Sequence, residues 1–357
     1  MTEGFKSGGG YTKGKTPGGD QKALRLWLVC LDSNKGDELW KKEIEPNLPE
    51  APFADFLREH GYASSTPVTD GERVYVFFGK TGVFAFDLNG KQLWHQRVGN
   101  GTHGWGSAAS PVLSRNAIVL NASVESKALV GLDKITGKEL WRTKDLSLCW
   151  VSPVMVNLGT GKQEVVLNSP GKVIAYDPDN GTELWHCPGI GGGGLSGSTC
   201  STPAVQGDTV FIMGAGPATP ATMLAIRAGG QGDVSKTNLL WKHKAGAGIC
   251  SPVAFGGFVY FIDGTATCLA ADTGKPVYKE RLYDAGGEYA SPVIADGKIF
   301  ALTRFDGLFV LAVGEKYNQL AHNTFEGDAS IFNSTTAISG SRLFIRSNIY
   351  LYCFGKK

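Results

Sequence analysis

Aromatic and polar side chains recur in the irregular segments of this sequence, and their types suit the binding of a partner. Most of them stand a few residues before a Ser-Pro or Thr-Pro pair. Tyrosine and tryptophan offer large contact areas at a low cost in conformational entropy. The candidate residues for such a surface are Tyr62, His103, Trp105, Trp150, Glu288, Tyr289, Arg304 and Asn333.

A structural role is the alternative for each of these side chains. Trp105 and Trp150 could cap a hydrophobic core, and His103 could be a solvated turn residue. Lys80 and Arg304 both lie between two apolar runs, and they could join the same surface. The residue types alone leave both interpretations open.

Catalysis has less support than binding. Glu288 is the most suggestive acid because Tyr289 follows it, but one carboxylate without a partner makes no acid–base pair. The Gly-rich run at 189–198 lacks the Lys-Ser/Thr and the following helix of a phosphate-binding loop. No Gly-x-Ser-x-Gly motif stands in a strand–turn–helix context, and the six histidines are scattered. We therefore predict no catalytic residue.

The seven cysteines predict neither a metal site nor a disulfide framework. They include no Cys-x-x-Cys pair and no spacing typical of zinc ligands, and their number is odd. Two of them, Cys30 and Cys353, occupy a position where other copies of a repeat carry a small residue, so we interpret them as small buried hydrophobic residues.

A repeat of about 40 to 55 residues must position the candidate side chains. Residues 128–144 read ALVGLDKITGKELWRTK, and variants of this pattern fill 26–42, 82–97, 172–186 and 266–279. In each copy an apolar strand ends in Asp, a Gly with positive φ closes the turn, and a large aromatic follows four residues later. The Asp residues are Asp32, Asp87, Asp133, Asp177 and Asp272.

The fixed offset predicts that these aromatic side chains lie on one face of a fourth strand, packed against the next repeat. They are Trp40, Trp94, Trp141, Trp185, Trp241 and Tyr278. A small residue precedes the end of most third strands, which predicts a close approach there. The residues at that position are Cys30, Ala85, Gly131, Ala175, Ala225, Ala270, Val310 and Cys353.

A Ser/Thr-Pro pair opens each unit. Proline cannot donate to a β ladder, so it should lie at the start of a strand on the edge of the sheet. Copies stand at 66–67, 110–111, 152–153, 202–203, 251–252 and 291–292, with Thr335-Thr336 as a degenerate last copy. Short strands in repeats of this length predict an all-β propeller of four-stranded antiparallel blades, with this pair on the innermost strand beside the channel. The candidate residues would then surround one channel mouth.

The repeats predict a single propeller domain over 23–357, preceded by a flexible Gly-rich segment at 1–22. Six units are complete, but 23–44 holds only third and fourth strands, and 330–355 holds a first, second and third. Because the two partial units duplicate the third strand, we expect eight blades with incomplete ends; seven is the alternative. Residues 1–22 would then be a remnant of the first blade.

Charge and hydropathy exclude some classes of partner. The net charge of +2 is spread along the chain, which argues against nucleic acid. No run of about 18 apolar residues occurs, and the N-terminus lacks the apolar core of a signal peptide. We expect a monomer without a membrane span.

The LDxxTGKELW motif, the Ser/Thr-Pro strand and the spacing together resemble the pyrroloquinoline-quinone (PQQ)-like propeller repeat. Trp-Asp repeats place Trp-Asp on the third strand after an upstream Gly-His, and neither feature recurs here. The resemblance covers nearly all of the chain after residue 22. It implies similarity to exported bacterial repeat proteins, and more distantly to the lipoprotein of outer-membrane assembly and to quinoprotein dehydrogenases.

This resemblance implies a noncatalytic binding or scaffolding module outside the cytoplasm, in the periplasm or secreted, with a protein or glycan partner. The alternative is a PQQ-dependent quinoprotein dehydrogenase that oxidises alcohols or sugars with bound calcium. Those enzymes commonly carry two adjacent cysteines, which this sequence lacks, and no set of calcium ligands matches theirs. We therefore expect no cofactor and no metal.

Overall fold

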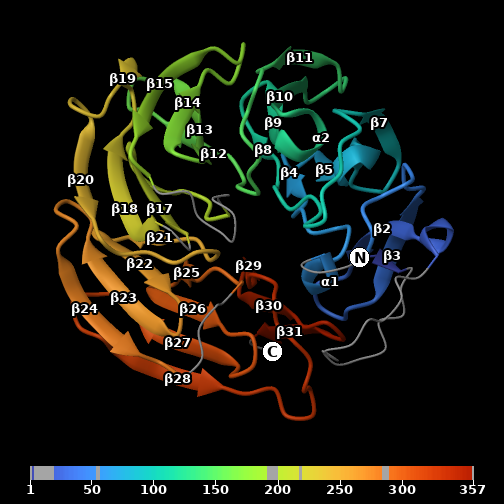
Figure 1. Cartoon of the computed structure of the whole chain (residues 1–357). Helices are drawn as coiled ribbons and strands as arrows, with labels where there is room; N and C mark the ends of the chain where they lie inside the picture. The colour runs from blue at the N-terminus through green and yellow to red at the C-terminus, as the bar shows by residue number, and fades with distance from the viewer. Residues whose placement is uncertain are drawn as a thin grey trace. The chain divides into compact units, whose positions relative to one another are not determined.

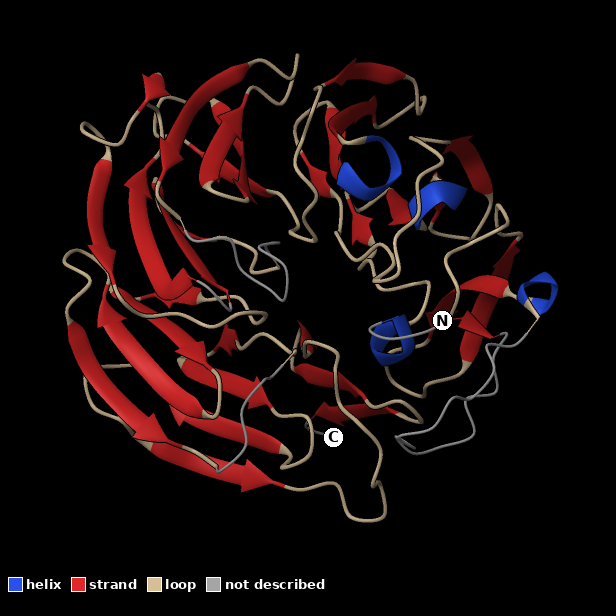
Figure 2. Cartoon of the chain, in the orientation of Figure 1, coloured by secondary structure: helices blue, strands red, loops and turns tan. Residues whose placement is uncertain are grey.

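A computed structural model describes residues 2–3, 20–53, 57–190, 200–216, 219–283 and 289–355. Strands make up nearly all of its regular structure, and only short helices interrupt them (Figures 1 and 2). The chain is an all-β propeller of antiparallel blades. It divides into two compact units, Met1–Met155 with Asp177–Thr182 and Val156–Tyr176 with Glu183–Lys357.

The first unit contains one three-stranded sheet, β1-β2-β3, and two four-stranded sheets, β4-β5-β6-β7 and β8-β9-β10-β11. Its strands are β1 (Thr2–Glu3), β2 (Arg25–Leu31), β3 (Glu38–Ile44), β4 (Val68–Thr69), β5 (Arg73–Phe77), β6 (Val83–Asp87), β7 (Gln92–Gln96), β8 (Val112–Leu113), β9 (Ala117–Ala122), β10 (Ala128–Asp133) and β11 (Glu139–Arg142). Its helices are the 3₁₀ turns η1 (Gln21–Ala23) and η2 (Gly79–Thr81) and the single α turns α1 (Leu57–His60) and α2 (Ser123–Ser126).

The second unit begins within β12 and contains the remaining sheets. Its strands are β12 (Val154–Asn157), β13 (Gln163–Ser169), β14 (Lys172–Tyr176), β15 (Glu183–Pro188), β16 (Ala204–Gln206), β17 (Thr209–Gly216), β18 (Thr219–Arg227), β19 (Gly232–Asp233), β20 (Leu239–His243), β21 (Val253–Phe255), β22 (Phe258–Ile262), β23 (Thr265–Ala270), β24 (Pro276–Arg281), β25 (Val293–Ala295), β26 (Lys298–Leu302), β27 (Leu308–Ala312), β28 (Gln319–Asn323), β29 (Ala337–Ser339), β30 (Arg342–Arg346) and β31 (Leu351–Gly355).

The expected count of eight blades is wrong, and the alternative of seven is correct. Six sheets have at least four strands, whereas β1-β2-β3 and β29-β30-β31 have three each. Neither end sheet has the strands of a complete blade. Most of the segment 1–22, expected to be a flexible remnant of a first blade, lies outside the described residues; Thr2 and Glu3 pair with Leu26 and Arg25 of β2.

The repeated aromatics occupy equivalent positions on the fourth strands, each opposite a small residue of the third strand. The pairs are Cys30 with Trp40, Ala85 with Trp94, Gly131 with Trp141, Ala175 with Trp185, Ala225 with Trp241 and Cys268 with Tyr278. The ladder shifts register directly after each small residue, which is the bulge that a Gly-containing turn produces.

In the copy at 266–279, the third strand ends two residues earlier than predicted. The residue opposite Tyr278 is Cys268, not Ala270. Ala270 instead occupies the position of the turn Asp, because its N–H donates to the Lys275 carbonyl and its carbonyl accepts from Gly274. Asp272 therefore lies inside the turn, since this copy has Ala where the others have Asp.

Most of the repeated tryptophans bridge to the turn of the following blade. A Cβ built on the turn glycine would lie 2.4–2.8 Å from the indole ring, so only Gly lets the ring lie flat against the backbone. The indole N–H also donates to a carbonyl of the same turn at 2.8–3.2 Å. Ring, glycine and acceptor are Trp40, Gly90 and Leu88; Trp94, Gly137 and Lys134; Trp141, Gly181 and Pro178; and Trp241, Gly274 and Ala271.

Trp185 is the exception, because the turn after β18 is replaced by a longer segment. β19 in that segment pairs in parallel with β15, which extends this blade to five strands. The Trp185 indole donates instead to the buried carboxylate of Glu164 at 2.8 Å, and the Gly229 N–H donates to the same oxygen at 3.2 Å. A buried carboxylate here takes the place of a turn carbonyl.

A second series of hydrogen bonds joins the segments that begin the first strands. Five of the Ser/Thr residues that precede the proline donate their backbone N–H to the hydroxyl of the equivalent residue in the next blade, at 2.8–3.0 Å. The series runs Thr66 to Ser110 to Ser152 in the first unit, and Thr202 to Ser251 to Ser291 to Thr335 in the second. The degenerate copy thus keeps the hydroxyl although it has lost the proline.

Candidate binding site

The structure brings together four of the predicted surface residues in the first unit and three in the second. Tyr62, His103, Trp105 and Trp150 lie in the first unit. The members in the second are Tyr289, Arg304 and Asn333. Glu288 lies outside the described residues.

His103, Trp105 and Trp150 form an aromatic cluster with all three rings in contact. The centroid distances are 5.8 Å for His103–Trp105, 4.9 Å for His103–Trp150 and 4.7 Å for Trp105–Trp150. Trp150 is buried, at 8 % exposed, whereas His103 and Trp105 are half-buried. Trp150 therefore forms the buried side of the cluster, and the rings of His103 and Trp105 form its accessible surface.

A tight turn holds the aromatic cluster in shape. The Trp105 N–H donates to His103 Nδ1 at 3.1 Å, and the Gly106 N–H donates to the His103 carbonyl at 2.8 Å. The Trp150 indole donates to the Gly106 carbonyl at 2.8 Å, so this hydrogen bond joins the loop of Trp150 to the loop that contains His103 and Trp105. Gly106 has φ +66° and lies against Leu57, so a side chain there would be strained and would clash.

The protonation state of the cluster follows from burial. Desolvation lowers the pKa of His103, because it disfavours the imidazolium. Its Nδ1 accepts a hydrogen bond from a backbone amide, which also requires an unprotonated nitrogen there. At neutral pH the cluster is thus an uncharged aromatic surface.

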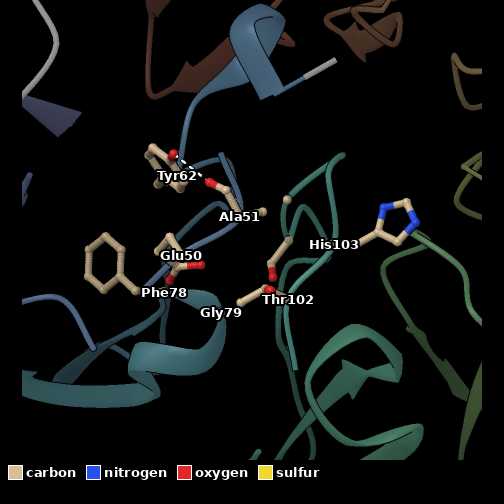
Figure 3. Close-up of a pocket in the computed structure, with 9 residues that line it drawn as sticks. Glu50, Ala51, Tyr62, Phe78, Gly79, Thr102 and His103 are labelled. Carbon is tan, nitrogen blue, oxygen red and sulfur yellow. Dashed lines mark hydrogen bonds between the residues drawn. The ribbon is translucent and has the colours of Figure 1, made fainter. Parts of the chain in front are cut away.

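A small pocket, which we call the carboxyl pocket, lies beside this cluster and shares His103 with it (Figure 3). Its lining residues are Glu50, Ala51, Tyr62, Phe78, Gly79, Thr102, His103, Gly106 and Ser107. It has room for about one water molecule. The Tyr62 hydroxyl donates to the Ala51 carbonyl at 2.8 Å across one side of it.

Two glutamates flank the carboxyl pocket. Glu50 lines it, and the buried Glu125 on α2 lies behind Ser107, whose hydroxyl donates to its carboxyl group. Burial raises the pKa of Glu50 to about 7, although the Lys80 charge opposes this shift. Burial also raises the pKa of Glu125 to about 7; the Ser107 hydrogen bond opposes the shift, and the Glu50 charge adds to it.

The sequence analysis missed both glutamates, although one signal pointed to Glu125. It lies between the second and third strands of its blade, as Lys80 and Arg304 do, and those two were selected from that position. Glu50 follows β3 in an irregular segment, and nothing in its spacing distinguishes it from an exposed acid. Its proximity to Glu125 depends on packing between segments far apart in the chain.

The three predicted residues of the second unit also meet. Arg304 Nε donates to Asn333 Oδ1 at 3.0 Å, and its guanidinium lies 4.4 Å from the centre of the Tyr289 ring, a cation–π contact. The neighbouring Phe305 is 65 % exposed and was not predicted. The Arg304 carbonyl accepts from the N–H of the buried Phe332, which fixes this loop to the core.

Comparison with known proteins defines the family. A family profile described as "Outer membrane protein assembly factor BamB" matches residues 25–232, more than half of the chain. The chain belongs to this family. No curated protein matches the BamB-family chain.

Two solved structures share the propeller fold with this BamB-family chain. One is BamB from Moraxella catarrhalis, with 15 % identity and a TM-score of 0.59, covering 81 % of this chain and 84 % of that one. The other is the computationally designed Ika8 protein, with 13 % identity and a TM-score of 0.56, covering 83 % and 84 %. At these identities the likeness shows the fold alone.

Across the described ranges, no group of three or more His, Cys, Asp or Glu side chains is placed to hold a metal ion. None of the helices in the described part of the chain has the length and apolar character needed to span a membrane. The BamB-family chain presents two candidate surfaces on its β scaffold: the aromatic cluster of His103, Trp105 and Trp150, and the loop in which Arg304 contacts Tyr289.

Proposed function

We propose that this chain is a noncatalytic propeller that binds a partner protein outside the cytoplasm and acts as a scaffold in assembly. The observation that carries the proposal is the aromatic cluster, in which half-buried Trp105 and His103 rest on buried Trp150. Membership of the BamB family supports a role in assembly rather than in chemistry.

The chemistry of the cluster favours a protein surface as its ligand. Trp and Tyr are enriched at binding hot spots, where rigid rings fill pockets of the partner. Trp105 is held by contacts with two other rings, so little side-chain entropy is lost on binding. The Arg304 loop, with the exposed Phe305, provides a second patch of similar chemistry in the other unit. A glycan is the other ligand class that such rings accept.

Binding should depend on Trp105. The partner would first be identified by cross-linking to the purified chain, and its Kd then measured by calorimetry for the parent and for Trp105→Ala. Loss of a hot-spot aromatic costs about 2 kcal/mol or more, so we expect Kd to rise about 30-fold. Tyr289→Ala tests the second patch in the same way. Glycan-array binding lost in Trp105→Ala would indicate a glycan ligand instead.

Phe255→Ala is the matched control, because Phe255 is an exposed aromatic (49 %) on β21 rather than in these loops. All variants should melt within about 2 °C of the parent, since surface substitutions change stability little. Equal affinity of the parent and both loop variants would place the functional surface elsewhere.

The chain should neither bind PQQ tightly nor oxidise alcohols or sugars. The reasons are the missing adjacent cysteine pair and the lack, among the described residues, of a cluster of metal ligands. Calorimetry with PQQ and calcium, followed by a dye-linked alcohol and aldose oxidation assay, checks this expectation. Micromolar binding together with turnover would favour a quinoprotein dehydrogenase.

A further inference from the structure

Residues 45–53, which we call the strap, lie against the loops of the first two complete blades. The Asn47 N–H donates to Thr81 Oγ1 at 3.0 Å, and Lys80 Nζ donates to the Pro49 carbonyl. The Glu50 N–H donates to Gln21 Oε1 at 3.0 Å. A few polar contacts thus hold the strap in place, and its Glu50 and Ala51 form part of the wall of the carboxyl pocket.

The two acids come from different elements and lie on either side of Ser107, which lines the carboxyl pocket with Glu50 and donates to Glu125. Glu50 belongs to the strap, whereas Glu125 belongs to α2 and is only 5 % exposed. Gly79 packs so closely on Ser107 that an added Cβ would lie 2.7 Å from its hydroxyl, so the Ser107–Glu125 pair is confined. Ionising both carboxylates is unfavourable mainly because burial disfavours each charge, and the Glu50 charge adds to this effect at Glu125.

The surrounding charges can balance one carboxylate but not two. Lys80 is the only cation that lowers the pKa of Glu50 among the described groups, and it is buried. Tyr62, whose pKa burial and the Glu50 charge raise to about 12, stays neutral, as does His103. Titratable side chains of the neighbouring described segments include His60, which contacts Ser64; His95, bonded to the Thr81 carbonyl; and Arg142, bonded to Ser126 and paired with Glu139.

We propose that the strap is a proton-linked latch, closed over the carboxyl pocket while Glu50 and Glu125 are protonated and loosened when both ionise. For both acids the pKa is raised from 4.5 to about 7 in the folded chain. Their contribution to stability is therefore fully present below pH 4.5 and is lost as the pH rises through about 7.

Loosening of the strap would reach the binding residues through Tyr62. Its hydroxyl donates to the Ala51 carbonyl of the strap, and its ring lies 6.0 Å from that of Phe53. When the strap loosens, Tyr62 loses both neighbours, while the aromatic cluster keeps its own contacts. An effect on partner binding rests on the proposed function; the latch itself does not.

Hydrogen exchange of the strap amides tests the latch directly. The Asn47 and Glu50 amides donate to side chains, so their protection reports closure. After correction for intrinsic rates, we expect about tenfold lower protection at about pH 8.5 than at about pH 5.5. The Glu50→Gln, Glu125→Gln double variant, which cannot ionise at these positions, should remove this dependence.

Glu38→Gln is the matched control, since Glu38 is an exposed acid of β3 in the same unit, and it should keep the dependence on pH. Unchanged protection across this pH range, or the same dependence in the double variant, would overturn the latch. If the double variant fails to fold, carbon-13 titration of the two carboxyl groups in the parent decides, and ordinary pKa values near about 4.3 would also overturn it. A latch confirmed by exchange in a chain that binds no protein would refute the proposed function alone.

Discussion

Replacing Trp185 with alanine is expected to lower the free energy of unfolding by more than the same change at Trp141. Removing a fully buried Trp costs about 3–5 kcal/mol through lost burial and the cavity that remains. Trp185 is 0 % exposed, and its indole N–H also satisfies the buried Glu164 carboxylate. Leaving that carboxylate with one donor fewer adds about 1–3 kcal/mol. Urea denaturation of both variants and the parent measures the difference.

Trp141→Ala should show the full cost of lost burial but a smaller cost from the lost hydrogen bond. Trp141 is 8 % exposed, and its N–H partner is the carbonyl of the buried Pro178 at 2.9 Å, a neutral group that costs less to leave without its donor than a carboxylate does. Trp185→Phe combined with Glu164→Gln tests the added cost. If Glu164→Gln rescues part of the loss in Trp185→Phe, the unpaired charge is the cause. Equal losses at Trp141 and Trp185 would show that the carboxylate contributes nothing.

The repeat in the sequence predicts most of the blade architecture because it is set by local geometry. An aromatic placed four residues after a positive-φ glycine must return on the adjacent strand, one register after the bulge. Where Ala270 replaces the turn Asp, the sequence pattern places the copy two residues too far along the chain. The hydrogen bonds of the turn are nevertheless the same as in the other copies. The blade count failed for another reason, since it depends on how incomplete ends combine.

The sequence predicts the part of the candidate site that belongs to the repeat, but not the part that lies outside it. Trp105 and Trp150 each stand a few residues before a Ser-Pro pair, so the repeat itself predicts that their loops are neighbours. It does not predict that Trp150 is buried, because the contact with the Gly106 carbonyl arises from one particular turn. Glu50 lies in a connection without a counterpart in the other blades, so periodicity carried no information about it.

Asn121 links the stability of its blade to the aromatic cluster, and its replacement should damage both. Asn121 is 3 % exposed; its Nδ2 donates to the carbonyls of Cys149 at 3.1 Å and Val151 at 2.9 Å, on either side of Trp150. Its Oδ1 accepts from the Ser123 N–H at 2.9 Å. Asn121→Ala removes the hydrogen bonds to the Val151 carbonyl and the Ser123 N–H, whereas the Cys149 carbonyl keeps the Ser123 hydroxyl at 2.8 Å; we expect a cost of about 2–4 kcal/mol in urea denaturation.

The loss should also be visible at the binding surface, because the 149–151 segment holds Trp150 under Trp105 through these same carbonyls. Without Asn121 the segment keeps the Ser123 hydroxyl at Cys149 but loses its contact at Val151, so the Trp150 indole is held less firmly at the Gly106 carbonyl. Near-UV circular dichroism should therefore lose tryptophan signal below the melting transition, and partner affinity should fall with it.

Asn116→Ala is the control, since Asn116 is an exposed amide of the same blade whose side chain donates across the surface to Asp179 at 3.3 Å. If Asn121→Ala destabilises the fold while the tryptophan signal and the affinity stay at parent values, the aromatic cluster is held by other contacts and Asn121 serves the blade alone.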